Sequence, residues 1–317
     1  YRHMAREELA FVYHYGDFIY EYQQNYLYDS GLPIRPVRRY EQRALIDVTD
    51  FRAAYAQTLL DIDQQAVRSV HAHLSSFDDH EIRNDWVSDI DNWKMGLPGN
   101  DPDAAPPEVF MLKKQAAMQA WYEHMPVRKA LLPRGGMVAM NREFRYGDLM
   151  AMQLLDTRQY RDDQPCGDGF KPACPEVNGK DAQVLGKAQE EWLGRNLAKG
   201  GATWNALAQQ VTMMSLDRRR KPDEPKKIVN LDSWGGYEAP RERILSRLGG
   251  LDNCVVLTGD EHQNFCGDLV LKDKVVGAEF VATSISSGGD GSDKRNGTDE
   301  FLKLNPELKF ANDQRGY

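Results

Sequence analysis

The sequence predicts an α/β fold in a single domain, on three observations. Segments with helical spacing of apolar residues are interspersed with short apolar runs typical of buried strands. No convincing domain linker separates these segments, and the sequence contains no internal repeat. The chain of 317 residues, with 41% hydrophobic and 28% charged residues, is long and apolar enough to bury a large core.

The first predicted elements are an amphipathic helix at the start of the chain and a strand at 9–15. This apolar and aromatic run ends in Gly16-Asp17, which is typical of a buried strand followed by a turn. Helical spacing then predicts helices at about 47–73 and 107–124.

The clearest buried strand is predicted at 253–258 (NCVVLT), where a continuous apolar run stops at Gly-Asp. The Gly- and Ser-rich stretch at 284–298 is expected to be a loop. The remaining predicted strands are at 144–155, 204–214 and 275–284, and the remaining predicted helices are at 186–198 and 241–248.

Charge and hydropathy exclude some classes of protein. The net charge of -8 opposes sequence-independent binding to nucleic acid, which needs clustered Lys and Arg. The basic run at 218–221, followed by Lys226-Lys227, is interpreted as a solvated loop. No apolar run has the length of about eighteen residues that a transmembrane helix needs. A small phosphate-bearing substrate remains compatible, because bound cations can neutralise it and these require acidic ligands.

The four cysteines are of two kinds. Cys166 and Cys174 flank a short Gly- and Pro-rich loop, which favours a disulfide and an oxidising compartment over the alternative of a metal-binding pair. Cys254 and Cys266 are expected to be buried thiols. The opening residues lack the pattern of an export signal and do not begin with Met, so the native start is expected upstream.

Three short motifs share one chemical logic. Gly16-Asp17 ends the first strand, Asp78-Asp79-His80-Glu81 precedes Asn84, and Gly259-Asp260-Glu261-His262 ends the strongest strand. Ligands of open α/β sheets bind outside the carboxyl ends of the strands, so these motifs are expected to meet at one rim. Their carboxylate, amide and imidazole groups, together with a Tyr oxygen, suit hard or borderline cations such as ferric iron.

Each motif has a plain structural alternative. Gly-Asp after a strand is often only a turn, and the Asp-Asp-His-Glu segment would also make a good helix cap. The occurrence of all three in one chain favours a metal site.

The sequence resembles the PhoD-type alkaline phosphatases, relatives of the calcineurin-like metallophosphoesterases and the purple acid phosphatases. The resemblance runs over nearly the whole chain. It is carried by GDFIYEY at 16–22, FDDHEIRNDW at 77–86, QAWYEHMPVR at 119–128, LLDTRQYR at 154–161, LGKAQEEWL at 185–193, DSWGGY at 232–237, VVLTGDEH at 255–262 and EFVATSISS at 279–287.

The resemblance implies a metallophosphoesterase-like β-sandwich flanked by helices, with iron (Fe3+) and calcium (Ca2+) as cofactors. Asp17 would bridge two cations and Tyr20 would bind ferric iron. Asp79 and Asn84 would be ligands or would hydrogen-bond the bound water and phosphate. The implied metal residues are Asp17, Tyr20, Asp79, Asn84, Asp260 and His262.

Two further residues are implied in catalysis. His80 occupies the place of a histidine that assists the leaving group in related metallophosphatases. Arg158 is a candidate phosphate clamp, because a guanidinium fork matches phosphate oxygens. The alternative for Arg158 is a structural ion pair with Asp156, and Asp232 and Trp234 are candidates for the border of the pocket.

The expected activity is hydrolysis of small phosphate esters, as an alkaline phosphatase with phosphomonoesterase and possible phosphodiesterase activity. Bound cations would lower the pKa of a bridging water, and the resulting hydroxide would attack phosphorus in line with the departing alkoxide. No G-x-S-x-G nucleophile motif is present, so no phosphoserine intermediate is expected. The alternatives are a phospholipase D-like diesterase acting on phospholipids or teichoic acids, and an inactive metal-binding fragment.

The chain departs from the family pattern at both ends. It begins after the strand that carries a Ser-Cys-Gln motif in the family and stops before the closing strands, so we expect one catalytic domain at 1–317, truncated at both ends. The family and the expected disulfide together imply a secreted or periplasmic protein.

Overall fold

The computed structural model describes residues 1–21, 44–91, 105–219, 226–285, 287 and 291–317. Contacts between Cα atoms divide the chain into two compact units. The first comprises the described residues up to Ala139, and the second comprises those from Met140 onward. The expectation of one catalytic domain stays a prediction. Parts of the predicted loops at 218–227 and 284–298 lie outside the described residues.

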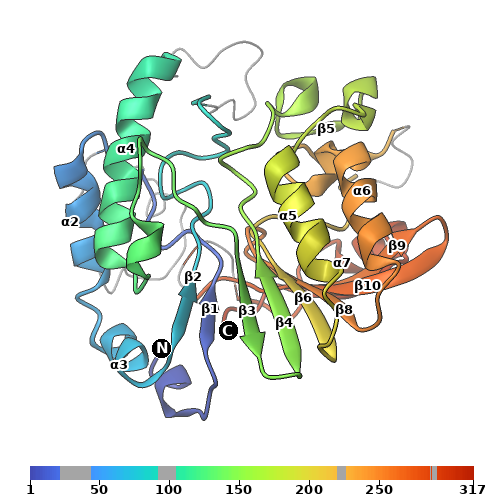
Figure 1. The fold of residues 1–317 in the computed structure, drawn as a ribbon. Helices are drawn as coiled ribbons and strands as arrows, with labels where there is room; N and C mark the ends of the chain where they lie inside the picture. Colours follow the sequence, from blue (N-terminus) through green and yellow to red (C-terminus); the bar gives the residue numbers. More distant parts are fainter. Residues whose placement is uncertain (22–43, 92–104, 220–225, 286, 288–290) are drawn as a thin grey trace. The chain divides into compact units, whose positions relative to one another are not determined.

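The first unit contains a pair of parallel strands, β1 (Val12–His14) and β2 (His73–Ser75). Val12 pairs with His73 and His14 with Ser75, so the two strands end side by side (Figure 1). The segments that follow them, which carry the first two acidic motifs, therefore leave the sheet at the same edge.

Helices complete the first unit: α2 (Val48–Thr58), α3 (Ile62–Val70) and α4 (Pro107–His124). The Asp47 carboxylate caps α2 and Asp61 caps α3, each by accepting backbone N–H groups of the first turn. Helices α2 and α4 pack on each other. Short 3-10 helices lie at Met4–Arg6 (η1) and Lys129–Leu131 (η2). The core is rich in aromatic side chains, including Phe51, Tyr55, Phe77, Trp86, Phe110 and Trp121.

Among the described residues, the second unit contains a seven-stranded mixed sheet in the order β11-β9-β10-β8-β6-β4-β3. Its central strands β4, β6, β8 and β10 are parallel, and β3, β9 and β11 are antiparallel to their neighbours. The parallel strands therefore present their carboxyl ends at one edge. The strands are β3 (Arg142–Tyr146), β4 (Met150–Leu154), β6 (Trp204–Ala208), β8 (Cys254–Thr258), β9 (Asn264–Leu271), β10 (Lys274–Val281) and β11 (Leu308–Asn312).

Helices α5 (Lys187–Leu197) and α6 (Glu238–Leu248) lie side by side on one face of this sheet (Figure 1). Their apolar faces and the sheet bury one core cluster, which includes Leu193, Ile244 and Val256. Helix α7 (Thr298–Leu304) packs near β11. A small antiparallel pair, β5 (Phe170–Pro172) with β7 (Ile228–Asn230), and the 3-10 helices η3 (Pro165–Gly167), η4 (Pro175–Asn178) and η5 (Trp234–Gly236) complete the second unit.

The predicted α/β class, with a central sheet flanked by helices, is confirmed. Some elements differ from the expectation. The opening segment forms only a short 3-10 helix, the helix predicted at 47–73 is two helices because Asp61 starts a new one, and the strand predicted at 144–155 is a hairpin. No helix in the described part of the chain is both long and apolar enough to cross a membrane.

Candidate metal centre

The turn after β1 brings Asp17 against the segment after β2. Gly16 has a φ of 134°, and a Cβ there would overlap Asp78, so glycine is required for this close approach. Asp17 itself has a φ of 57°, which is uncommon for a residue with a side chain. Backbone outliers of this kind cluster at functional sites, and here the outlier is one of the predicted ligands.

Three of the predicted site residues lie together in the first unit. Ligand atoms of Asp17, Asp79 and His80 all lie within 4.8 Å of one another. The Tyr20 hydroxyl donates to Oδ2 of Asp17 at 3.3 Å, and the Tyr20 ring lies 4.2 Å from that of His80, measured between centroids. Asp79 also accepts the backbone N–H groups of His80 and Asp85, both at 2.8 Å, which fixes its turn.

Asn84, the remaining predicted ligand of the first unit, lies in this same turn. Its side-chain amide donates to Oδ2 of Asp85 at 2.7 Å, and its backbone N–H donates to Oε1 of Glu21 at 2.7 Å. Asn84 is thus held by the segments that carry the cluster.

The electrostatics of this cluster fit a cation. Burial, followed by the charges of Asp79 and Asp78, raises the pKa of Asp17 well above its usual value, although His80 opposes this. The Oδ1 atom of Asp17 is buried without a hydrogen-bond partner among the described residues. A bound cation would satisfy this oxygen and relieve the repulsion between the carboxylates. The donor set therefore fits a metal ion.

Glu21 pairs with His80, a contact that the sequence did not predict. The Nδ1 atom of His80 lies 2.7 Å from Oε2 of Glu21. Burial raises the pKa of Glu21, but the charge of His80 and the hydrogen bonds outweigh it and lower the pKa overall. Burial likewise lowers the pKa of His80, while Asp79, Glu21 and Asp17 outweigh it and raise this pKa well above its usual value. Glu21 falls in the GDFIYEY motif, which was the available signal.

In the second unit, Asp260 and His262 lie in the turn after β8. Both have positive φ angles, 68° and 53°. The intervening Glu261 forms an ion pair with Arg218 and accepts a hydrogen bond from Thr212 at 3.1 Å. The backbone carbonyl of His262 accepts from the Thr283 hydroxyl at 3.1 Å, which ties the turn to the segment after β10.

Arg158 follows β4, at the same sheet edge as the turn after β8. Its guanidinium is fully buried and forms a two-pronged ion pair with Asp232, with both N–O distances 2.8 Å. Asp156 accepts the backbone N–H groups of Arg158 and Gln159, each at 3.0 Å, and so caps the turn. Arg161 also contacts Asp232, at 2.6 Å. The role of Arg158 as a phosphate clamp stays a prediction, and its pairing with Asp232 was not foreseen.

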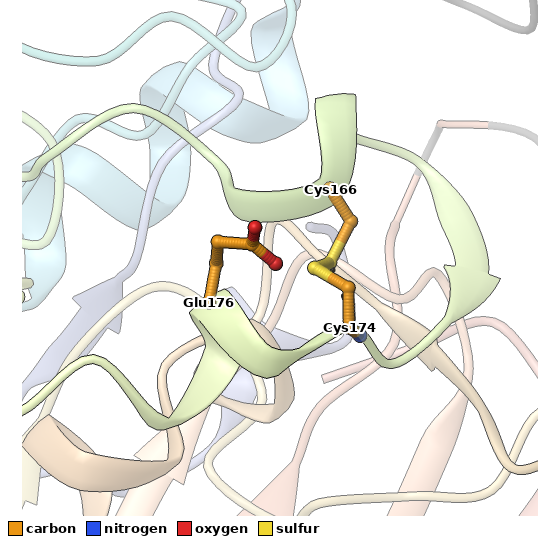
Figure 2. Close-up of side chains that lie close together, drawn as sticks. All are labelled: Cys166, Cys174 and Glu176. Atoms are coloured by element: carbon orange, nitrogen blue, oxygen red, sulfur yellow. Dashed lines mark hydrogen bonds between the residues drawn. A yellow bond between two sulfur atoms is a disulfide. The ribbon is translucent and has the colours of Figure 1, made fainter.

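Cys166 and Cys174 are joined by a disulfide, as favoured from the sequence, with their Cα atoms 5.9 Å apart (Figure 2). Glu176 lies beside this bond, but both sulfurs are already committed to each other. Cys254 is buried as expected, and Cys266 is half-buried.

The mixed sheet and the acidic turns at strand ends are features of a metallophosphatase-like α/β protein. The model of the PhoD-like phosphatase family matches residues 1–317, and the chain belongs to this family. It is 41% identical to alkaline phosphatase D of Bacillus subtilis over 325 aligned positions, which cover 100% of this chain and 53% of the relative. The chain therefore spans about half the length of that relative.

A solved structure of PhoD superposes with a TM-score of 0.89 at 40% identity, covering 100% of this chain and 59% of that one. A purple acid phosphatase from yellow lupin seeds gives a TM-score of 0.40 at 10% identity, over 75% of this chain and 35% of that one.

Proposed function

We propose that this chain is the catalytic part of a metal-dependent phosphoric ester hydrolase, an alkaline phosphatase of the PhoD type. The observation that carries the proposal is the cluster of Asp17, Asp79 and His80, with a buried Asp17 oxygen that lacks a hydrogen-bond partner among the described residues. This cluster occurs in a chain whose family and relative are named as phosphatases.

The proposed ligands are the residues predicted from the sequence. Asp17, Tyr20, Asp79 and Asn84 lie in the first unit, and Asp260 and His262 lie in the second. Fe3+ and Ca2+ are the proposed cations, and when bound they would polarise phosphoryl oxygens and activate a water as the attacking hydroxide.

The protein side chains have separate proposed roles. Asp17 and Asp79 supply negative charge that holds the cations. His80, whose raised pKa keeps its imidazole charged near neutral pH, can donate a proton to the departing oxygen. The Glu21 carboxylate orients the His80 ring for this role through its contact with Nδ1.

Substrate preference is tested with p-nitrophenyl phosphate and bis-p-nitrophenyl phosphate, comparing the wild-type chain with Asp17→Ala. We expect hydrolysis of the monoester at the higher rate, and its loss in the variant. Preference for the diester would instead favour an enzyme acting on phospholipids or teichoic acids. Absence of hydrolysis of either ester by the wild-type chain would contradict the proposal and favour a metal-binding fragment.

We further propose that the protein is secreted or periplasmic. The disulfide between Cys166 and Cys174 supports this, because such bonds persist in oxidising compartments. Fractionation of the producing cells tests it, and recovery in the cytosol alone would contradict it.

A further inference from the structure

Glu81 is a fully buried carboxylate to which neither the sequence motifs nor the proposed function assigns a role. Its Oε2 atom accepts the backbone N–H groups of Asp17 at 3.0 Å and Asp78 at 2.8 Å. Its Oε1 atom accepts the backbone N–H group of Phe18 at 2.7 Å. One side chain thus binds the main chain of both acidic turns in the first unit.

These hydrogen bonds hold a conformation that the chain would otherwise avoid. Asp17 has a φ of 57°, in the left-handed region where a side chain costs energy. The turn must also bring the Asp17 carboxylate close to that of Asp79, although the two charges repel each other. Without a fixed main chain, both effects would favour separation of the turns.

The Phe18 amide gives a second fixed point beside the turn. The Phe18 ring stacks on Tyr55, with centroids 5.9 Å apart, and lies 5.3 Å from the His14 ring. The half-buried side chain of Phe18 is therefore packed against the buried Tyr55, while its backbone N–H is bound by Glu81. Asp17 is held between this anchor and Gly16.

We propose that Glu81 is a positioning residue that presets the Asp17 and Asp79 carboxylates for a cation by binding the backbone of the Asp17 and Asp78 turns. This inference rests on the proposed function, since it assumes that these carboxylates bind metal. Outer groups that orient metal ligands typically contribute about 10–100-fold to metal affinity.

The test is calorimetric titration of the metal-stripped chain with Ca2+ alone. A glutamine at position 81 has one acceptor oxygen and one NH2 group, which is a donor. At least one of the three backbone N–H groups would then face a donor instead of an acceptor. We expect Glu81→Gln to weaken Ca2+ binding by about tenfold or more. Asp17→Ala serves as the reference for loss of a ligand.

Asp50→Asn is the matched control for a merely structural effect. Asp50 is also a buried carboxylate of the first unit, and it accepts the backbone N–H groups of Ile46 and Asp47 at 3.2 and 3.3 Å. We expect Asp50→Asn to lower stability without changing the Ca2+ affinity. An equal loss of affinity in Asp50→Asn would overturn the inference, because the effect would then follow stability.

The remaining outcomes separate the two proposals. Wild-type affinity in Glu81→Gln, with affinity lost in Asp17→Ala, would overturn the role of Glu81 and leave the proposed function standing. Absence of Ca2+ binding by the wild-type chain would overturn both.

Hydrogen exchange of the wild-type chain gives a readout that does not depend on the folding of a variant. If Glu81 couples the turns to the cation, Ca2+ should slow exchange of the Asp17, Phe18 and Asp78 amides. The Ile46 and Asp47 amides, bound to Asp50, should be unaffected. Unchanged exchange of the first set at saturating Ca2+ would contradict the inference.

Discussion

The Nδ1 atom of His80 lies 2.7 Å from Oε2 of Glu21, and the other carboxylate oxygen of Glu21 accepts the backbone N–H of Asn84. This arrangement fixes the imidazole ring relative to the turn that carries Asp79. Burial lowers the pKa of His80, but the charges of Asp79, Glu21 and Asp17 outweigh it and raise this pKa well above its usual value, which favours the protonated ring that the proposed proton donation needs.

His80→Gln is expected to slow hydrolysis according to the leaving group. A general acid contributes about 10²–10⁴ in rate, and it matters most when the departing oxygen is basic. Phenyl phosphate should therefore lose far more kcat than p-nitrophenyl phosphate, and Glu21→Gln should show the same trend with a smaller loss. An equal fall for both substrates would assign His80 a role other than proton donation.

The ion pair of Arg158 with Asp232 predicts a large effect on stability. Both side chains are buried, and Arg161 shares the same carboxylate. Asp232→Asn would leave two guanidiniums without their anion, at a cost of about 3–5 kcal/mol in the free energy of unfolding. Urea denaturation measures this, and Arg195→Ala, which removes an exposed pair with Glu191, should change little.

The variant Arg158→Lys tests whether Arg158 acts as a phosphate clamp. If Arg158→Lys left stability unchanged and raised KM for the ester, the guanidinium would act on substrate more than on Asp232. A loss of stability with unchanged KM would assign it to the fold.

Glu279 predicts a pH dependence of stability. Burial raises the pKa of Glu279 to about 7, although hydrogen bonds from the backbone N–H groups of Met213 and Met214 oppose this rise. The folded chain therefore binds this proton more tightly than the unfolded chain does. The stabilisation that this proton binding adds to the free energy of unfolding is fully present below the ordinary pKa of 4.5. It is lost as pH rises through about 7.

The measurement is the free energy of unfolding of the wild-type chain minus that of Glu279→Gln, at several pH values. This difference should fall by about 3 kcal/mol between about pH 4.5 and about pH 8. Burial also raises the pKa of Glu81 to about 7. Both proteins retain Glu81, so its contribution to the pH dependence cancels in this difference. Parallel pH profiles would show that Glu279 keeps its ordinary pKa.

The sequence predicted best those elements whose signal is local. The strand predicted at 253–258 is β8 (Cys254–Thr258), because an apolar run is bounded there by turn residues. The strand predicted at 204–214 stops at Ala208, and further along the chain Met213 and Met214 donate their backbone N–H groups to the Glu279 carboxylate rather than to a neighbouring strand. A pattern of apolar residues does not show whether the backbone N–H groups donate to a neighbouring strand or to a buried side chain.

The candidate site was predictable only in part for the same reason. Asp17 stands out because it follows an apolar run, and Asp79 stands out because it lies in the Asp-Asp-His-Glu segment. Glu21, Glu81 and Asp232 lie in recognisable motifs, but each binds a partner 59 to 74 residues away in the sequence, so the motifs do not show what these carboxylates bind. Their roles emerge only when β1 pairs with β2 and when the turn after β4 reaches the segment after β7.

Loss of the disulfide should destabilise the second unit. Cys166 and Cys174 are separated by 8 residues and pack against the small cluster of Val177, Val229 and Leu231. Cys166→Ser with Cys174→Ser should lower the free energy of unfolding by about 2–3 kcal/mol, from the entropy of a short closed loop.

Thiol titration of the denatured chain checks the pairing behind this prediction. Without reductant only Cys254 and Cys266 should react, and all four cysteines should react after reduction. Four reactive thiols without reductant in protein from an oxidising compartment would contradict the bond.

Under the proposed function, the Asp17 cluster holds the cations on which hydrolysis depends. The most direct measurement is the rate of p-nitrophenyl phosphate hydrolysis after removal of metal by a chelator and again after addition of Fe3+ and Ca2+, in the wild-type chain and in Asp17→Asn. Asparagine preserves the shape of the side chain but removes the charge that a cation needs. We predict that the wild-type chain loses activity on stripping and regains it on addition, whereas Asp17→Asn remains inactive. Full activity of the stripped wild-type chain, or equal recovery by Asp17→Asn, would show that the Asp17 cluster does not hold the cations needed for hydrolysis.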